Sequence, residues 1–248
     1  MQLPEPFGVL GEHFTVVLPG ARAAFTTRRG GHSRGPYASL NLGRLTGDDP
    51  AAVQLNRTRL EAEIGGRLSF VRQVHGSRVC ETTSVSAQAG AGALERLESA
   101  DGQVTRSRGI ALAALTADCL PIAIAGRGAA AMLHAGWRGL QAGVIAAGVR
   151  RLGSERGPLA AAIGPGAGPC CYEVGHEVHA AFDGLPARVH RGRKLDLKAI
   201  ARHQLLAVGV ADVHDIAICT ICSDPSLLFS HRRDHGVTGR QAGVAWLS

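Results

Sequence analysis

The chain has 248 residues, and its 27 Lys and Arg against 20 Asp and Glu give a formal net charge of +7. Nucleic-acid binding is not expected, because 25 of the 27 basic residues are arginines scattered along the chain and aromatic residues for base stacking make up only 4%. The sequence has no apolar run of about 18 residues, as a membrane-spanning helix would need. Its N-terminus lacks the basic segment followed by an apolar stretch that is typical of a secretory signal. Its six cysteines are not arranged like the disulfide framework of a small secreted protein. We therefore expect a cytoplasmic protein without membrane contact and with reduced thiols.

In chain order, apolar stretches first predict strands at 14–18 and 22–27. The clearest helix follows them. Asp49 is a typical N-cap, Pro50 suits the first helical position, and the pattern stops near Gly65.

Arg57 is the informative residue of this helix. It falls at helical spacing on the face that carries Val53, Leu60 and Ile64. An arginine there either extends its charged end to water or meets a buried anion. The guanidinium fork suits phosphate oxygens, so we predict phosphate or ribose contact.

The rest of the chain alternates further strands with a few helices. Strands are predicted at 68–74, 78–85, 110–115, 121–125, 129–134, 159–163, 214–219 and 242–247, and helices at 138–152, after Glu173 and at 195–208. Many strands succeed one another without a helix, which argues against a doubly wound parallel sheet. We predict an α+β (mixed α/β) fold in a single domain, residues 1–248, with layered mixed sheets flanked by helices. A monomer is expected.

Three segments at predicted strand ends carry metal-ligand side chains. They are Gln73-Val74-His75-Gly76, the segment 117–121 with Cys119, and the segment 134–139 that begins with His134. Catalytic zinc keeps three protein ligands and an open position, and two His with one Cys are an acceptable set. The alternative is that these are packed residues, since free Cys is among the most buried types.

Two other features have simpler interpretations. Cys219 and Cys222 form a C-x-x-C pattern, but no second such pair exists, and we assign both to a buried strand. The Gly- and Pro-rich segment 164–169 either approaches a substrate or is a turn that packs Cys170 and Cys171.

Taken together, the motifs resemble the YfiH-like family, formerly called multicopper polyphenol oxidase or laccase domain and now associated with purine nucleoside phosphorylase activity. The resemblance runs nearly from end to end. Besides the three ligand segments it rests on 25–28, 39–43, 47–49, Asn56-Arg57, 163–174, Phe229-Ser230, Arg232-Arg233 and 238–241.

This resemblance implies zinc held by His75, Cys119 and His134, with copper possible in vitro. It also implies phosphorolysis of purine nucleosides of the adenosine, inosine and guanosine type to base and ribose 1-phosphate, with accompanying adenosine deaminase activity. Asn41, Arg57 and Arg138 are predicted to bind substrate or phosphate. Two departures are Ala201, where the family pattern has Asn, and His231, where it commonly has Tyr.

Arg138 opens a predicted helix, where free N–H groups favour anions, although the Gly136-Trp137-Arg138-Gly139 segment could be only a turn with Trp137 in the core. For proton movement we consider a carboxylate such as Asp118 or Glu173. Asp118 is the candidate catalytic residue beside the ligands, though in such a position Asp is more often a structural turn residue.

Three other classes stay open. A copper-dependent polyphenol oxidase of the multicopper kind needs His-x-His pairs, and this sequence has none. A metal-independent cysteine hydrolase would use Cys119 with a histidine. A noncatalytic binding module would retain metal without turnover. No G-x-x-x-x-G-K-[ST] sequence supports a P-loop nucleotidase.

Overall fold

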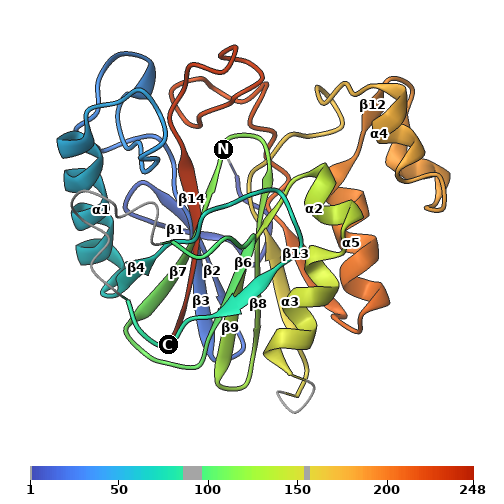
Figure 1. The fold of residues 1–248 in the computed structure, drawn as a ribbon, viewed down its shortest axis with the longest axis horizontal. Coiled ribbons are helices and arrows are strands. Elements are labelled where there is room, and N and C mark those ends of the chain that lie inside the picture. Colours follow the sequence, from blue (N-terminus) through green and yellow to red (C-terminus); the bar gives the residue numbers. More distant parts are fainter. Residues whose placement is uncertain (1, 86–96, 154–156) are drawn as a thin grey trace.

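The structure is a computed structural model that describes residues 2–85, 97–153 and 157–248. Two six-stranded mixed sheets form its centre (Figure 1). In the first sheet the strand order is β1 (Gly8–Leu10), β2 (His13–Leu18), β3 (Ala21–Phe25), β14 (Gln241–Leu247), β7 (Ile110–Thr116) and β4 (Arg67–Ser69). All neighbours in this sheet are antiparallel except β4 and β7.

The second sheet contains His134, one of the predicted ligands. Its order is β13 (Asp212–Asp215), β10 (Ala160–Ile163), β8 (Leu120–Gly126), β9 (Ala129–Ala135), β6 (Gly102–Thr105) and β5 (Val79–Glu81). The two edge strands pair parallel to their neighbours and the inner pairs are antiparallel. A separate small hairpin joins β11 (His190–Arg191) to β12 (Lys194–Leu195).

Helices cover both outer faces, which gives four layers (Figure 1). The helix α1 (Pro50–Ile64) lies against the first sheet, and α2 (Trp137–Gln141), α3 (Val144–Leu152) and α5 (Leu197–Ala207) lie against the second. The short helix α4 (His176–Ala180) and the 3-10 turns Gly35–Tyr37 and Ala187–Val189 complete the described elements. The predicted fold class, layered mixed sheets flanked by helices, is confirmed.

Strand alternation explains the layers. In β7, Leu112 and Ala114 pack between the two sheets, whereas Ala111 and Ala113 face α1. In β9, Met132 likewise lies between the sheets while its neighbours face the helices of the second sheet. Because both faces of each sheet are covered, these strands are apolar throughout rather than alternating with polar residues.

The first helix begins and ends where its sequence predicts. The Asp49 carboxylate accepts a hydrogen bond from the N–H of Ala51 at 2.9 Å, and Pro50 takes the first position. Gly65 ends the helix with a φ of 68°, a conformation that glycine adopts without strain. Arg57 is buried on the inner face, as predicted.

Other predicted boundaries are wrong. The expected helix 138–152 is two helices, because Gly143 has a φ of 84° and interrupts it. The strand expected at 68–74 ends at Ser69 and the one at 78–85 spans Val79–Glu81. The strands β1 and β6 were not predicted.

The strand expected at 214–219 is also displaced, which corrects the assignment of the C-x-x-C pair. It ends at Asp215, whose carboxylate accepts the N–H of Ala217 at 2.8 Å, and Ala217 has a φ of 59°. Cys219 keeps one bridge to Gly166 and Cys222 is exposed in a turn, so neither lies in a buried strand. Among the described residues no helix is both long and apolar enough to span a membrane.

Candidate active site

The pairing of β8 with β9 brings two of the three predicted ligands together. Leu120 pairs with Ala135, so Cys119, just before β8, lies beside the end of β9 that carries His134. His75 approaches from the loop after β4. The ligand atoms of His75, Cys119 and His134 all lie within 4.8 Å of one another.

The backbone around His75 is held by a single carboxylate. His75 is exposed and has a φ of 60°. The N–H groups of Val74, His75 and Gly76 donate to the carboxylate of Asp101 at 3.2, 2.9 and 2.6 Å. Asp101 immediately precedes β6, so this carboxylate anchors the His75 loop to the second sheet.

The same carboxylate orients His134. Oδ1 of Asp101 lies 2.8 Å from Nδ1 of His134, and the N–H of His134 donates to the Asp101 carbonyl at 2.8 Å. Burial raises the pKa of the Asp101 carboxyl, but bonds from His134, Gly76 and Val74 outweigh it and hold that pKa below its usual value. With Nδ1 occupied, Nε2 of His134 is the nitrogen left for a metal or for Cys119. Nothing in the sequence distinguishes Asp101 from the other acidic residues, and it was missed.

Cys119 and His134 form a polarised pair. Burial raises the pKa of the Cys119 thiol, but the neighbouring His134 and His75 outweigh burial and bring it to about 6. Burial lowers the pKa of His134, but Cys119 and Asp101 reverse the effect and raise it to about 9. A thiolate between imidazoles fits a zinc ion with three protein ligands, and it also fits a nucleophile.

Gly136 makes room for this group. A Cβ at this position would lie 2.8 Å from Sγ of Cys119 and 3.3 Å from Cδ2 of His75. A side chain of any size would therefore press on two predicted ligands.

The three side chains open into a cavity of about 760 Å³. Its wall is strongly basic, because six arginines but only one carboxylate, Asp118, are among the described residues that line it. The arginines are Arg44, Arg57, Arg72, Arg138, Arg232 and Arg240. Among the described residues none of them forms an ion pair with a carboxylate. Apolar surface comes from side chains that include Phe70, Trp137 and Tyr172.

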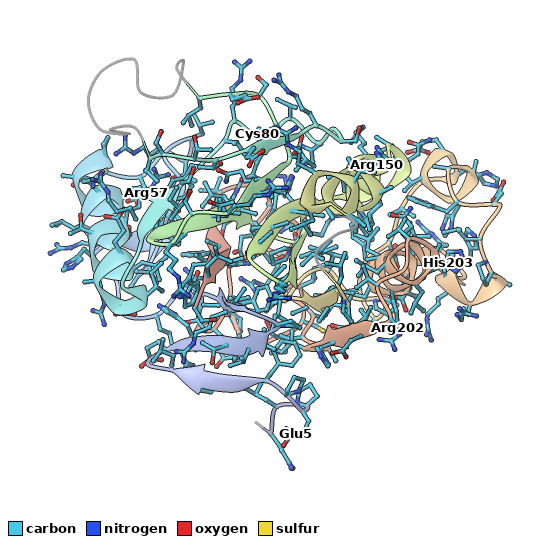
Figure 2. The ribbon with its side chains drawn as sticks, turned by 90° about the horizontal axis from the view of Figure 1, so that it is seen from below. Glu5, Arg57, Cys80, Arg150, Arg202 and His203 are labelled. Carbon is cyan, nitrogen blue, oxygen red and sulfur yellow. The ribbon has the colours of Figure 1, made fainter. Side chains whose placement is uncertain are left out.

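Arg57 reaches this cavity from the inner face of α1, which Figure 2 shows at one side of the molecule. Its Nε and Nη2 donate to the carbonyl of Leu42 at 3.0 and 2.7 Å, and its guanidinium lies 3.8 Å from the centre of the Phe70 ring. Burial and the nearby Arg44 lower the pKa of Arg57 to about 9. Among the residues the structure describes, this buried cation contacts a carbonyl and a ring but no carboxylate, so it is suited to an anion.

Arg240 was given no role from the sequence, although its motif was noted. Its Nη1 donates to the carbonyls of Thr238 and Gly239 at 3.2 and 2.9 Å. Burial lowers its pKa, while the charges of Asp118 and Cys119 oppose that effect, so this guanidinium lies within reach of the predicted ligand Cys119. Arg138 is exposed and its guanidinium lies 4.2 Å from the Trp137 ring.

The predicted proton-transfer carboxylates differ in location. Asp118 lines the cavity with a φ of 92°, and its two oxygens accept bonds from the Thr220 hydroxyl at 2.6 Å and the Arg232 N–H at 2.7 Å. Glu173 does not line the cavity, and its carboxylate lies 3.8 Å from Arg193.

Asn41 is fully buried and is not among the lining residues. Its Nδ2 donates to Thr46 and Asp48, both at 2.9 Å, and its Oδ1 accepts the N–H of Gly43 at 3.0 Å and of Arg240 at 2.8 Å. The amide therefore holds the backbone next to Arg240.

The two departures from the family pattern have different settings. Ala201 is buried in α5 within the core of the second sheet, away from the cavity lining. His231 is exposed and lines the cavity, so only this departure meets the space available to a substrate.

Comparisons with known proteins place the chain in a family. Residues 22–248 match the family described as multi-copper polyphenol oxidoreductase laccase. The chain is 39% identical to a purine nucleoside phosphorylase of Corynebacterium glutamicum, over 91% of this chain and 94% of that protein. It is 40% identical to a purine nucleoside phosphorylase of Pseudomonas aeruginosa, over 91% and 93%. The crystal structure of the Bacillus licheniformis hypothetical protein YfiH superimposes with a TM-score of 0.87 at 30% identity, over 99% of this chain and 100% of that one.

Proposed function

Because the chain belongs to the multi-copper polyphenol oxidoreductase laccase family, which includes YfiH, we propose that it is a zinc-dependent purine nucleoside phosphorylase with accompanying adenosine deaminase activity. Its substrates are nucleosides of the adenosine, inosine and guanosine type together with phosphate. The observation that carries the proposal is the cavity where a His-Cys-His group is surrounded by six arginines, none of which forms an ion pair with a carboxylate among the described residues.

His75, Cys119 and His134 would hold the zinc ion. The set of two imidazoles and a thiolate fits this ion, and the bond from Asp101 to Nδ1 leaves Nε2 of His134 for the metal. When bound, zinc supplies a Lewis acid with an open coordination position. Copper would compete for the same donors in vitro.

The arginines bind and orient phosphate. Arg57 is fixed by Leu42 and Phe70 and keeps part of its fork for a ligand, while Arg240 interacts electrostatically with Asp118 and Cys119. Arg138 adds a further charge at the exposed end of the cavity. We assign Asn41 the positioning of Arg240, through the bond from its backbone N–H, rather than a direct substrate contact.

The purine is expected to lie against the apolar part of the wall. Phe70, Trp137 and Tyr172 offer aromatic faces for a flat base. In phosphorolysis a phosphate oxygen attacks C1′ and the C1′–N9 bond breaks. The bonding electrons pass to the purine, which takes up a proton. The products are the free base and ribose 1-phosphate, and catalysis comes from positioning and charge stabilisation.

Asp118 is our candidate for moving that proton, because it is the only carboxylate among the described lining residues. Its bonds from Thr220 and Arg232 fix the direction of both oxygens. The same group would serve deamination, in which water adds at C6 of adenosine and ammonia leaves.

Two alternatives use the same residues. In the described part of the chain only two groups of His, Cys, Asp or Glu are arranged for metal binding, and one of them is all cysteine. The imidazoles in these two groups are those of His75 and His134, which are fewer than a multicopper oxidase needs, and this favours the phosphorylase. A cysteine hydrolase would use the Cys119–His134 pair directly and without metal.

The test is chromatographic product analysis of zinc-loaded protein with adenosine, with and without phosphate, beside Cys119→Ala and a Cys80→Ala control. Cys80 is a buried cysteine of β5 outside the cavity lining. We expect phosphate-dependent adenine release that only Cys119→Ala abolishes. Inosine formation without phosphate would report the deaminase activity. Adenosine turnover by metal-free protein would support the hydrolase, and no turnover of any purine nucleoside would refute the proposal.

A further inference from the structure

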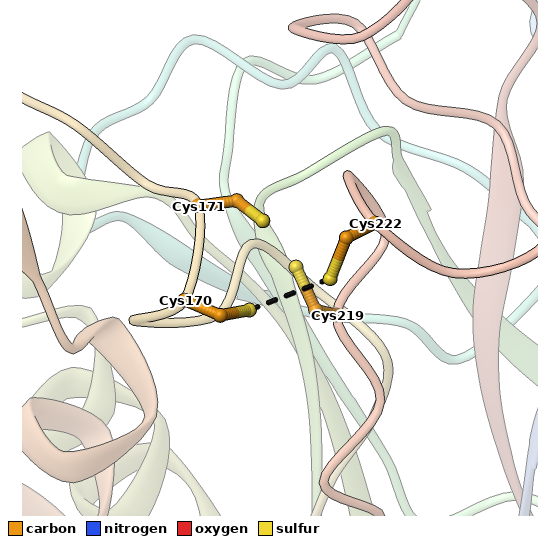
Figure 3. A group of neighbouring side chains, drawn as sticks. All are labelled: Cys170, Cys171, Cys219 and Cys222. Atoms are coloured by element: carbon orange, nitrogen blue, oxygen red, sulfur yellow. Dashed lines mark hydrogen bonds between the residues drawn. The ribbon is translucent and has the colours of Figure 1, made fainter.

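Four cysteines outside the active-site cavity converge at one point. Cys170 and Cys171 come from the loop after β10, and Cys219 and Cys222 from the turn after β13. Figure 3 shows the four side chains directed toward a common centre. Their sulfur atoms all lie within 4.8 Å of one another, and Sγ of Cys170 is 3.5 Å from Sγ of Cys222.

Backbone hydrogen bonds bring the two cysteine-bearing segments together. Cys219 forms a bridge with Gly166, and the N–H of Thr220 donates to the Gly166 carbonyl at 3.1 Å. The N–H of Ser223 donates to the Cys219 carbonyl at 3.1 Å, which closes the turn between the two cysteines of the C-x-x-C pair. Main-chain hydrogen bonds therefore hold the turn that carries Cys219 and Cys222 against Gly166, in the loop that carries Cys170 and Cys171.

Packing does not account for the cluster. Cys170 and Cys222 are exposed and the other two are half-buried, whereas cysteines that serve as small apolar residues are usually buried. All four are free thiols.

One sulfur is already prepared to carry negative charge. The N–H of Gly168 donates to Sγ of Cys219 at 3.2 Å. Backbone donors directed at a sulfur stabilise a thiolate, which is the form that binds metal.

We propose that Cys170, Cys171, Cys219 and Cys222 bind a structural Zn²⁺ as four thiolates, at a site separate from His75, Cys119 and His134. Structural zinc is tetrahedral with four protein ligands at about 2.3 Å, so its sulfurs lie about 3.8 Å apart. The observed spacing, from 3.5 Å for one pair to at most 4.8 Å, requires only a small contraction. Zinc is preferred over harder cations because thiolates are soft ligands.

The site would fasten one wall of the active-site cavity. Thr220, next to Cys219, donates to Asp118, and Tyr172, next to Cys171, lines the cavity. A metal that joins the two loops would fix both contacts. The metal assignment itself does not depend on the proposed reaction.

The experiment measures metal in the full chain, purified under reducing conditions. Cys119→Ala removes a ligand of the first site, so zinc retained by this variant reports the second. We expect one equivalent of zinc in Cys119→Ala. Adding Cys170→Ser and Cys222→Ser to this variant should remove that zinc. Adding Cys80→Ala instead should leave the zinc content unchanged. Zinc should protect four thiols of Cys119→Ala from a thiol reagent.

A second measurement needs no change in the cluster. Cobalt added to metal-free Cys119→Ala should give the strong visible and charge-transfer absorption of a tetrahedral thiolate site. Absence of this absorption from folded protein would overturn the proposal, as would zinc retention after the double substitution. A chain mass lower by two hydrogens per cysteine pair would also overturn it, because the cysteines would then be disulfides.

Discussion

Oδ1 of Asp101 lies 2.8 Å from Nδ1 of His134, and the same carboxylate accepts the N–H of His75 at 2.9 Å. One buried carboxylate thus sets the orientation of one candidate ligand and the backbone of another. It couples the start of β6 in the second sheet to the loop after β4.

Asp101→Asn should weaken zinc binding at the His-Cys-His site. The amide replaces one acceptor oxygen with a donor, so it cannot accept all the bonds that Asp101 accepts. Substitution of such a supporting group typically costs about 10–100-fold in metal affinity. Competition with a chromophoric chelator measures the change in Cys170→Ser/Cys222→Ser protein, with and without Asp101→Asn. Unchanged affinity would show that Asp101 has no influence on the ligands.

Gly136→Ala should damage the same site by steric pressure. The new Cβ would lie 2.8 Å from Sγ of Cys119, closer than real Cβ contacts. We expect weaker zinc binding and lower phosphorolysis with little change in the thermal midpoint. Gly184→Ala is the matched control, because a Cβ there meets nothing within 4 Å. Equal behaviour of the two variants would mean that the ligands shift freely.

Arg57→Lys should raise the KM for phosphate. Lysine keeps a charge but loses the planar fork, and a hydrogen bond to a charged group contributes about 1.5–3 kcal/mol, or roughly tenfold or more in affinity. Arg59→Lys is the control, since Arg59 lies on the same helix but pairs with Glu63 at the surface. Initial rates at varied phosphate distinguish the variants. A change in kcat alone would argue against phosphate contact by Arg57.

Thr220→Val should test whether the direction of the Asp118 carboxylate matters. Valine has nearly the same shape but cannot donate to Oδ1, a bond of 2.6 Å in this structure. If Asp118 moves a proton during turnover, kcat and its dependence on pH should change while the KM for phosphate stays near its original value. Asp118→Asn should then lower kcat further. Full activity of Asp118→Asn would exclude the carboxylate from proton transfer.

His13 should make folding stability depend on pH. It is 2% exposed, with Nε2 3.0 Å from Oε2 of Glu63. Burial and Arg59 lower its pKa, Glu63 and the backbone of Glu12 oppose them, and the net shift is downward from 6.5.

The unfolded chain therefore binds a proton more readily than the folded one. The contribution of His13 to stability is fully present above pH 6.5 and is lost as the pH falls toward the lower folded value. Urea unfolding at pH 7.5 and 5.5 should show a smaller loss for His13→Gln than for the unchanged protein. The exposed His32, changed to Gln, serves as the control. An identical loss in all three proteins would contradict this account.

Local interactions could be predicted from the sequence by itself. The helix α1 was predicted from its two ends. Asp49 caps the start, Pro50 fixes φ at the first position and Gly65 ends the helix in a left-handed conformation, and each of these effects is local. The apolar segments of β7, β8 and β9 were found because a strand covered on both faces is apolar throughout. Cys119 and His134 could be selected because each lies in a distinctive motif, one just before β8 and the other near the end of β9.

Only the tertiary structure decided which distant groups meet. Asp101 reaches His134 because β6 pairs with β9, a relationship between residues 33 apart that no local pattern encodes. Arg240 lines the cavity, and its backbone N–H donates to the side chain of Asn41, which is 199 residues away in the sequence. The C-x-x-C pair was wrongly assigned to a strand because its partners, Cys170 and Cys171, come from another loop. Sequence periodicity reports how a segment is buried, whereas a site depends on which segments lie side by side, and that is fixed by strand register and the packing of the two sheets.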